Sequence, residues 1–193
     1  MFEYIKGVID DLTPTSVVVE TAGIGYFLNI SLNTYSKLSG HKEAQLYLHQ
    51  VVRDDAHLFF GFYDANERGI FRYLISVSGV GANTARMMLS SLTPSEIQTA
   101  IISSDVKTLQ GVKGIGAKSA QRIIIELKDK LGKDTDITDF SLPQNNTTKE
   151  EALSALVMLG FTKNSVSKVI DKIFTANLDA SVEDLIKLAL KQL

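Results

Sequence analysis

Residues 74–85 have the sequence Leu-Ile-Ser-Val-Ser-Gly-Val-Gly-Ala-Asn-Thr-Ala, and residues 109–120 have the matching sequence Leu-Gln-Gly-Val-Lys-Gly-Ile-Gly-Ala-Lys-Ser-Ala. The two copies align without a gap, and both place a leucine, two glycines and an alanine at the same positions. Each copy is typical of an apolar helix end, a Gly-apolar-Gly turn and the start of a second helix. The repeat therefore predicts a tandem helix-hairpin-helix domain, a structure that grips nucleic-acid phosphates.

The predicted turns suit an anion because a helix N-terminus leaves backbone N–H groups unpaired and carries a partial positive charge. The two glycines allow a tight bend and a close approach of a phosphate, and the apolar residue between them is expected to plug into the protein. Such contacts carry no base information, so binding is expected to ignore DNA sequence. The candidate phosphate-binding residues are Gly79, Val80, Gly81, Asn83 and Thr84 in the first copy, and Gly114, Ile115, Gly116, Lys118, Ser119 and Arg122 in the second.

The two copies differ in charge. Lys118 and Arg122 are four residues apart, so a helix would place both on one face beside the second turn. An alternative for Arg122 is an ion pair with Glu126. The equivalent residues of the first copy are Asn83 and Met87, which carry no charge. The first turn is therefore expected to rely on its backbone amides together with Asn83 and Thr84.

Composition sets the limits of the interpretation. The chain has 193 residues and a net charge of −2, and it contains no cysteine, which excludes disulfides and thiolate metal sites and fits a reducing cytoplasm. Its N-terminus is too mixed for a signal peptide, and no apolar run is long enough to span a membrane. The charge is unevenly distributed: residues 1–64 carry four Lys or Arg against eight Asp or Glu, whereas residues 65–131 carry nine against five. The positive charge therefore coincides with the repeat.

Residues 1–64 are predicted to form a small closed barrel of the OB type, because five short segments rich in β-branched and aromatic residues are separated by turns. The predicted strands are 4–9, 16–20, 26–31, 45–52 and 58–63, with a turn at 23–25. An acidic composition is unusual for a barrel that binds single strands, so this part is interpreted mainly as a scaffold.

The remaining chain is predicted to be helical on both sides of a linker. Residues 65–131 form the tandem motif, and Thr93-Pro94-Ser95-Glu96 is a helix start. Residues 132–147 have little apolar periodicity and are predicted to be a flexible linker. Residues 148–193 are predicted to be a three-helix bundle, with helix starts at 148–151 and 181–184. The apolar residues around Gly160 are either core or an exposed patch for a partner: Leu156, Leu159 and Phe161.

Two further groups of residues were weighed as functional sites. Asp54 and Asp55 interrupt two apolar β segments, which favours a hairpin tip over a strand. A two-carboxylate metal site has no third ligand nearby in sequence. His41, His49 and His57 recur every eight residues, but the chain turns between them, so no metal and no cofactor are predicted.

Taken together, the barrel, the repeat and the tail resemble the RuvA family of bacterial Holliday-junction branch-migration proteins. The resemblance extends over the whole chain and is carried by residues 52–62, 79–81, 114–118 and 155–161. Ala82 and Asn83 stand where the family often has Pro-Lys, and Ala117 replaces one of two lysines. The family likeness implies an α+β multidomain protein that forms homotetramers, or octamers of two tetramers, around a four-way DNA junction.

The resemblance also implies roles for particular residues and partners. Asp54 and Asp55 would form an acidic pin at the crossover, and Leu156, Leu159 and Phe161 would contact a hexameric RuvB-type ATPase. A junction-resolving endonuclease is a further implied partner, in cytoplasmic recombination, repair and the SOS response. The chain itself is predicted to be non-catalytic. A DNA glycosylase or nuclease, which would need a catalytic pocket or metal site, and a peptide-binding scaffold are the alternatives.

Overall fold

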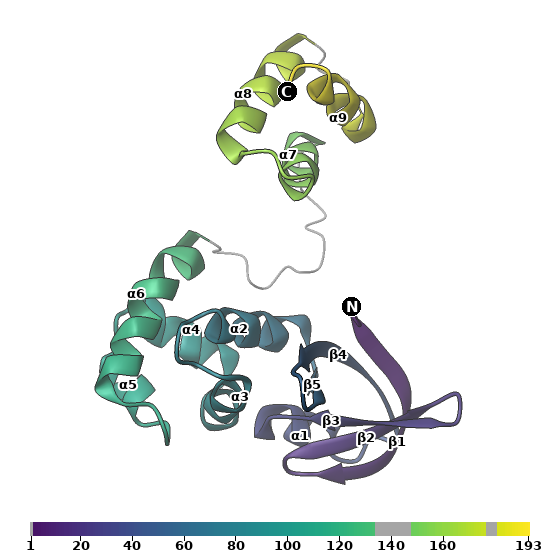
Figure 1. The fold of residues 1–193 in the computed structure, drawn as a ribbon, viewed down its shortest axis with the longest axis vertical. Helices are drawn as coiled ribbons and strands as arrows, with labels where there is room; N and C mark the ends of the chain where they lie inside the picture. Colours follow the sequence, from purple (N-terminus) through teal and green to yellow (C-terminus); the bar gives the residue numbers. More distant parts are fainter. Residues whose placement is uncertain (1, 134–147, 177–180) are drawn as a thin grey trace. The chain divides into compact units, whose positions relative to one another are not determined.

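The computed structural model describes residues 2–133, 148–176 and 181–193. The chain divides into two compact units, Met1–Phe140 and Ser141–Leu193. The first unit contains a β-barrel followed by a group of helices, and the second contains three helices (Figure 1).

The N-terminal strands close into a barrel in the order β1-β2-β3-β5-β4. All neighbouring strands are antiparallel except β3 and β5, which run parallel. Alternate residues point inward and are fully buried, among them Val17, Val19 and Leu46, as the period of two in a half-buried strand requires. The predicted five-stranded OB-type barrel is therefore confirmed. The strands are β1 (Tyr4–Thr13), β2 (Ser16–Thr21), β3 (Ile24–Asn29), β4 (Glu43–Val52) and β5 (His57–Phe62).

A short helix, α1 (Leu32–Leu38), was not predicted. Ser31, expected to end the third strand, is instead the N-cap of this helix, and its Oγ accepts a hydrogen bond from the backbone N of Thr34 at 3.0 Å. The third strand ends earlier, at Asn29, and begins earlier, at Ile24. The preceding turn therefore lies at Ala22 and Gly23, both of which have positive φ, rather than at residues 23–25.

The helices of the first unit pack beside the barrel and share a core with it (Figure 1). Phe60 and Phe62 of β5 lie in the same buried cluster as Phe71, with the Phe62 and Phe71 ring centroids 4.8 Å apart. The predicted helix start at Thr93 is confirmed as a full capping box with Glu96. These helices are α2 (Ala65–Ile75), α3 (Ala82–Ser91), α4 (Pro94–Ile102), α5 (Val106–Gln110) and α6 (Ala117–Lys133).

Polar side chains also join the barrel to the helices. Glu67 of α2 is completely buried and accepts hydrogen bonds from the hydroxyls of Ser31 and Thr34. Arg86 of α3 donates from Nη1 to Oδ1 of Asn29 at 2.9 Å. These buried and half-buried contacts hold the helical part in a fixed relation to the barrel.

The second unit is the predicted three-helix bundle: α7 (Thr148–Met158), α8 (Lys163–Ala176) and α9 (Val182–Leu190). Seven buried apolar residues from the three helices form its core. Ser181 caps α9 as predicted, accepting from the backbone N of Asp184. Of the predicted linker 132–147, Gly132 and Lys133 belong to α6, and residues 134–147 lie outside the described residues.

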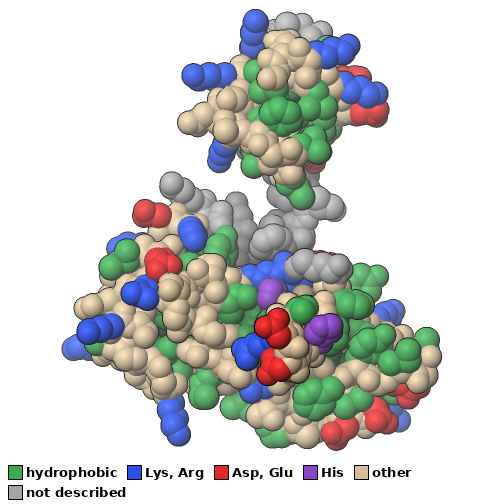
Figure 2. Space-filling model, in the orientation of Figure 1, with side chains coloured by type: hydrophobic (Ala, Val, Ile, Leu, Met, Phe, Trp, Pro, Cys, Tyr) green, Lys and Arg blue, Asp and Glu red, His purple; other side chains and the backbone are tan. Residues whose placement is uncertain are grey.

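Within the first unit, the two signs of charge are partly separated on the surface. Figure 2 shows acidic side chains over the end of the barrel where β1 and β2 lie, and lysine and arginine side chains over the outer helices. This separation matches the uneven charge of residues 1–64 and 65–131.

Candidate nucleic-acid interface

The two glycine turns have the same backbone geometry. Gly79 has φ of +89° and Gly114 has φ of +91°, a left-handed conformation that L-residues with a side chain rarely adopt. Val80 N–H donates to Val77 O at 3.0 Å, and Ile115 N–H donates to Val112 O at 3.0 Å. The repeat in sequence is therefore a repeat in structure, and the positive φ explains why both first positions are glycine.

The second glycine of each turn opens the following helix. Gly81 occupies the N-cap of α3 and provides no side-chain cap. The first intrahelical bonds are made by Ala85 N–H to Gly81 O and by Ala120 N–H to Gly116 O, each at 2.9 Å. Within the described residues, the backbone amides of residues 82–84 and 117–119 consequently have no protein acceptor. Each helix start presents three free N–H groups, an arrangement that binds anions.

The apolar residues between the glycines anchor the turns. Val80 is 6% exposed and Ile115 is 5% exposed, and both belong to the core of the helical part. Their amides are already engaged within the turn, so the contribution of Val80 and Ile115 is to hold the turn in place. Gly79, Gly81, Gly114 and Gly116 are exposed, which leaves the main chain open to a large ligand.

The polar candidates lie on the exposed starts of α3 and α6. Asn83 and Lys118 are exposed, and Thr84 and Ser119 are half-buried. Arg122 is exposed but does not pair with Glu126; its Nη1 donates to the carbonyl O of Ser78 at 3.2 Å. A Cβ added to Gly79 would lie 3.8 Å from the same nitrogen. Arg122 therefore brings positive charge from the second motif to the first, which has none of its own.

Asp54 and Asp55 stand at a hairpin tip, as the sequence predicted. The ladder between β4 and β5 ends at the pair Val52 and His57, and Arg53 N–H donates to Ala56 O at 2.8 Å to close the loop. Both carboxylates are exposed. The tip therefore presents two acidic side chains, with the Arg53 cation beside them.

The three partner-binding candidates of the bundle occupy different environments. Leu156 is completely buried in the core of the bundle, so its side chain is a structural element and is not available to a partner. Leu159 is 62% exposed, whereas Phe161 is partly buried against the core. Met158, which the sequence analysis did not single out, is 86% exposed. The exposed apolar surface therefore centres on Met158 and Leu159.

His41, His49 and His57 are not gathered into one group of potential ligands. His49 is half-buried, with its ring centroid 5.4 Å from that of Phe71, and burial together with nearby Arg72 and Arg68 lowers its pKa. Among the described residues, no three His, Asp or Glu side chains come together in a way that could hold a metal ion. Nor is any helix in residues 2–133, 148–176 and 181–193 long and apolar enough to cross a bilayer.

Three family models match successive parts of the chain. Residues 1–61 match the RuvA N-terminal domain, residues 71–129 match the SAM-like helix-hairpin-helix tandem, and residues 148–193 match the RuvA C-terminal domain. The chain is 50% identical over 193 residues to the Holliday junction branch migration complex subunit RuvA of Christiangramia forsetii, with all of both chains covered. The chain belongs to the RuvA family.

Other RuvA relatives match over the same extent. The subunit RuvA of Flavobacterium psychrophilum is 49% identical over 193 residues, and that of Bacteroides fragilis is 45% identical over 201 residues, each with full coverage of both chains. The three matched segments correspond to the barrel, the helices with both glycine turns, and the C-terminal bundle.

Sequence reasoning missed two connecting residues in this RuvA chain, one between the barrel and the first motif and one between the two motifs. Arg86 ties α3 to Asn29 of the barrel, and Ser78 accepts the hydrogen bond of Arg122. The partners are 57 and 44 residues apart in sequence, so neither contact produces a local signal. The unusual presence of an arginine on an otherwise uncharged α3 was the only available hint for Arg86.

Proposed function

We propose that this chain binds four-way DNA junctions through the phosphates of their arms, without sequence preference. The observation that carries the proposal is the pair of glycine turns, each followed by three unpaired amides. The relatives are named as subunits of a Holliday junction branch migration complex, which supports the same substrate. On this proposal Asp54 and Asp55 repel strands at the crossover and hold the junction open.

The chain would act as a non-catalytic, cytoplasmic subunit. A homotetramer around the junction would place four acidic tips at the centre, and two facing tetramers would place eight there. Residues 148–193 would recruit a hexameric RuvB-type ATPase, which supplies the energy for branch migration, and a junction-resolving endonuclease would act on the same complex. The exposed side chains of Met158 and Leu159 support a docking role for the bundle.

A binding comparison tests the central proposal. A four-way junction and a linear duplex of equal length are titrated at about 0.1 M salt, where exposed charges are screened beyond about 10 Å. We expect tighter binding to the junction, with the same affinity for junctions of unrelated sequence. Equal affinity for junction and duplex would refute the proposal, and cleavage of the junction by the protein alone with Mg²⁺ would favour a nuclease.

A further inference from the structure

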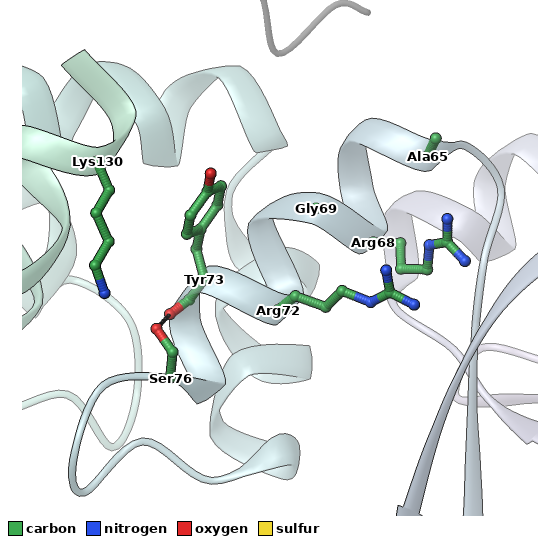
Figure 3. A pocket seen from close by; sticks show the side chains of 7 residues that line it. All are labelled: Ala65, Arg68, Gly69, Arg72, Tyr73, Ser76 and Lys130. Carbon is green, nitrogen blue, oxygen red and sulfur yellow. Dashed lines mark hydrogen bonds between the residues drawn. The ribbon is translucent and has the colours of Figure 1, made fainter. Parts of the chain in front are cut away.

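A cavity of about 410 Å³ lies along α2, outside the two glycine turns. It is lined by Ala65, Arg68, Gly69, Arg72, Tyr73, Ser76 and Lys130. Figure 3 shows Arg68 and Arg72 extending from α2 toward the barrel strands, while Lys130 approaches from α6 on the other side of Tyr73. Three cationic side chains from two helices therefore line one cavity.

The positive charge of this cavity is only partly balanced. Arg68 is well satisfied: its Nη2 pairs with Glu3 Oε1 at 2.5 Å, and its Nη1 donates to Glu3 O at 3.0 Å. Arg72 is less well satisfied, because its paired carboxylate oxygen, Glu3 Oε2, is 4.0 Å from Nη2. Its Nε and Nη2 are out of contact with solvent and have no hydrogen-bond partner among the residues that the structure describes. One third of the Arg72 side chain remains exposed. An oxyanion in the cavity would balance the charge that Glu3 leaves uncompensated.

The cavity lies between the two features assigned to DNA. Ser76, at one end, is three residues before Gly79 of the first turn. Near the other end, Arg68 contacts the carbonyl of Leu48 in β4, the strand that runs on to the acidic tip. A strand that passes from the crossover into an arm must cover the distance between the tip and the first turn.

We propose that this cavity is a third phosphate-binding site, which holds the backbone of a DNA strand where it leaves the crossover, with Arg72 and Lys130 as its principal cations. The inference rests on the proposed junction binding. It differs from the two turns in its chemistry, because it uses side-chain charge rather than main-chain amides. It also differs in its substrate, because a linear duplex bound along the turns does not have to reach it.

The test is a salt titration of Arg72→Gln, Arg72→Lys and Lys130→Gln on junction and duplex. Loss of one phosphate contact is expected to lower the salt slope by about 0.9 and the junction affinity by about fivefold near 0.15 M salt, for each site engaged. Duplex affinity should change much less. Arg72→Lys should keep most of the slope because it keeps the charge. Lys42→Gln, at the exposed residue just before the barrel's fourth strand, is the charge-matched control.

Each outcome decides a different point. An unchanged junction slope in both Arg72→Gln and Lys130→Gln would overturn the site. A loss of molar mass in light scattering, with the slope unchanged, would also overturn it and assign the cavity to an acidic segment of a second protein chain. Lys118→Ala probes the proposed function separately, since it should weaken junction and duplex alike. If Lys118→Ala leaves DNA affinity unchanged while Arg72→Gln lowers junction affinity, phosphate binding by the glycine turns is refuted and the cavity site is retained.

Discussion

The guanidinium of Arg122 donates from Nη1 to the carbonyl oxygen of Ser78, with 3.2 Å between the two atoms. Arg122 belongs to the helix after the second glycine turn, whereas Ser78 directly precedes the first. The contact therefore fixes one glycine turn relative to the other. It also places a cation beside the first turn, whose own motif contains no lysine or arginine.

Arg122→Ala is expected to weaken binding to junction and duplex alike. The variant removes both the contact with Ser78 and a cation beside Gly79, so the salt slope should fall by about 0.9 per lost phosphate contact. Because Arg122 is exposed, the free energy of unfolding should change by only about 0.5–1.5 kcal/mol. Arg122→Lys keeps the charge and should recover most of the slope, and a slope unaffected by Arg122→Ala would show that this cation does not touch DNA.

The glycines of the second turn should respond differently to alanine. Gly114→Ala forces a side chain into φ of +91° and is expected to cost about 1–2 kcal/mol of stability, measured by urea unfolding. Gly116 has no positive φ, and a Cβ there would have nothing within 4 Å. Gly116→Ala should therefore fold normally. It should nevertheless bind DNA more weakly than the unmodified protein, because the added methyl group obstructs the approach of the phosphate. An unchanged DNA affinity of Gly116→Ala would contradict phosphate binding at this turn.

Features that depend on a few adjacent residues could be predicted from the sequence, whereas features that depend on contacts between distant residues could not. The turns at Gly79 and Gly114 and the capping box at Thr93 and Glu96 were predictable, because each depends on a few adjacent residues. The helix α1 was missed because its seven residues are too few to show a helical period and lie within a β-rich region. Its stability depends on Glu67, which is distant in sequence, so no local pattern reveals it.

The bundle illustrates the same limit in another way. Residues 155–159 are all apolar, so the sequence identifies a hydrophobic helix end without showing which side faces inward. Only packing against α8 and α9 distinguishes the buried Leu156 from the exposed Met158. Of the three residues predicted to contact a partner, Leu156 therefore belongs to the core, whereas the role of the exposed Leu159 stays a prediction.

The acidic tip is expected to select against continuous duplex. A phosphate within about 4 Å of a carboxylate is disfavoured by about 1 kcal/mol in bulk water, and by more where water is excluded. Asp54→Asn combined with Asp55→Asn should therefore tighten binding to linear duplex and narrow the preference for junctions. Arg53→Gln is the matched control and should act in the opposite direction. Gel-shift titrations that give the same two affinities as the unmodified protein would rule out the pin.

The buried carboxyl of Glu67 predicts a pH dependence of stability. Burial is the main cause that raises its pKa; hydrogen bonds from Ser31 and Thr34 oppose the shift, and Asp64 adds to it. A carboxyl with a raised pKa in the folded state favours folding most when it is protonated. This contribution is lost as pH rises from the ordinary glutamate pKa of 4.5 through the folded-state pKa. Glu67→Gln removes this dependence.

The comparison is made by urea unfolding at several pH values between about 4.5 and 7. The free energy of unfolding of Glu67→Gln, relative to the unmodified protein, should rise with pH over this window. At low pH the two proteins should be close in stability, because an amide and a protonated carboxyl each offer one carbonyl oxygen as acceptor and one donor to the two hydroxyls. Glu43→Gln, at an exposed position of the barrel, is the control, and its free energy of unfolding should follow the same pH dependence as that of the unmodified protein. If Glu67→Gln also followed that pH dependence, the buried Glu67 carboxyl would not be its cause.

Leu159 and Leu156 are a matched pair for the proposed partner contact. Leu159→Ala removes a side chain that is 62% exposed, so stability should change by less than about 0.5 kcal/mol while stimulation of the ATPase partner falls. Leu156→Ala empties part of the core and should cost about 2–5 kcal/mol, with stimulation lost only as far as the bundle unfolds. Thermal unfolding and ATPase assays on both variants separate the two roles. If Leu159→Ala stimulates the ATPase fully, and Met158→Ala does too, the partner must bind another face of the bundle.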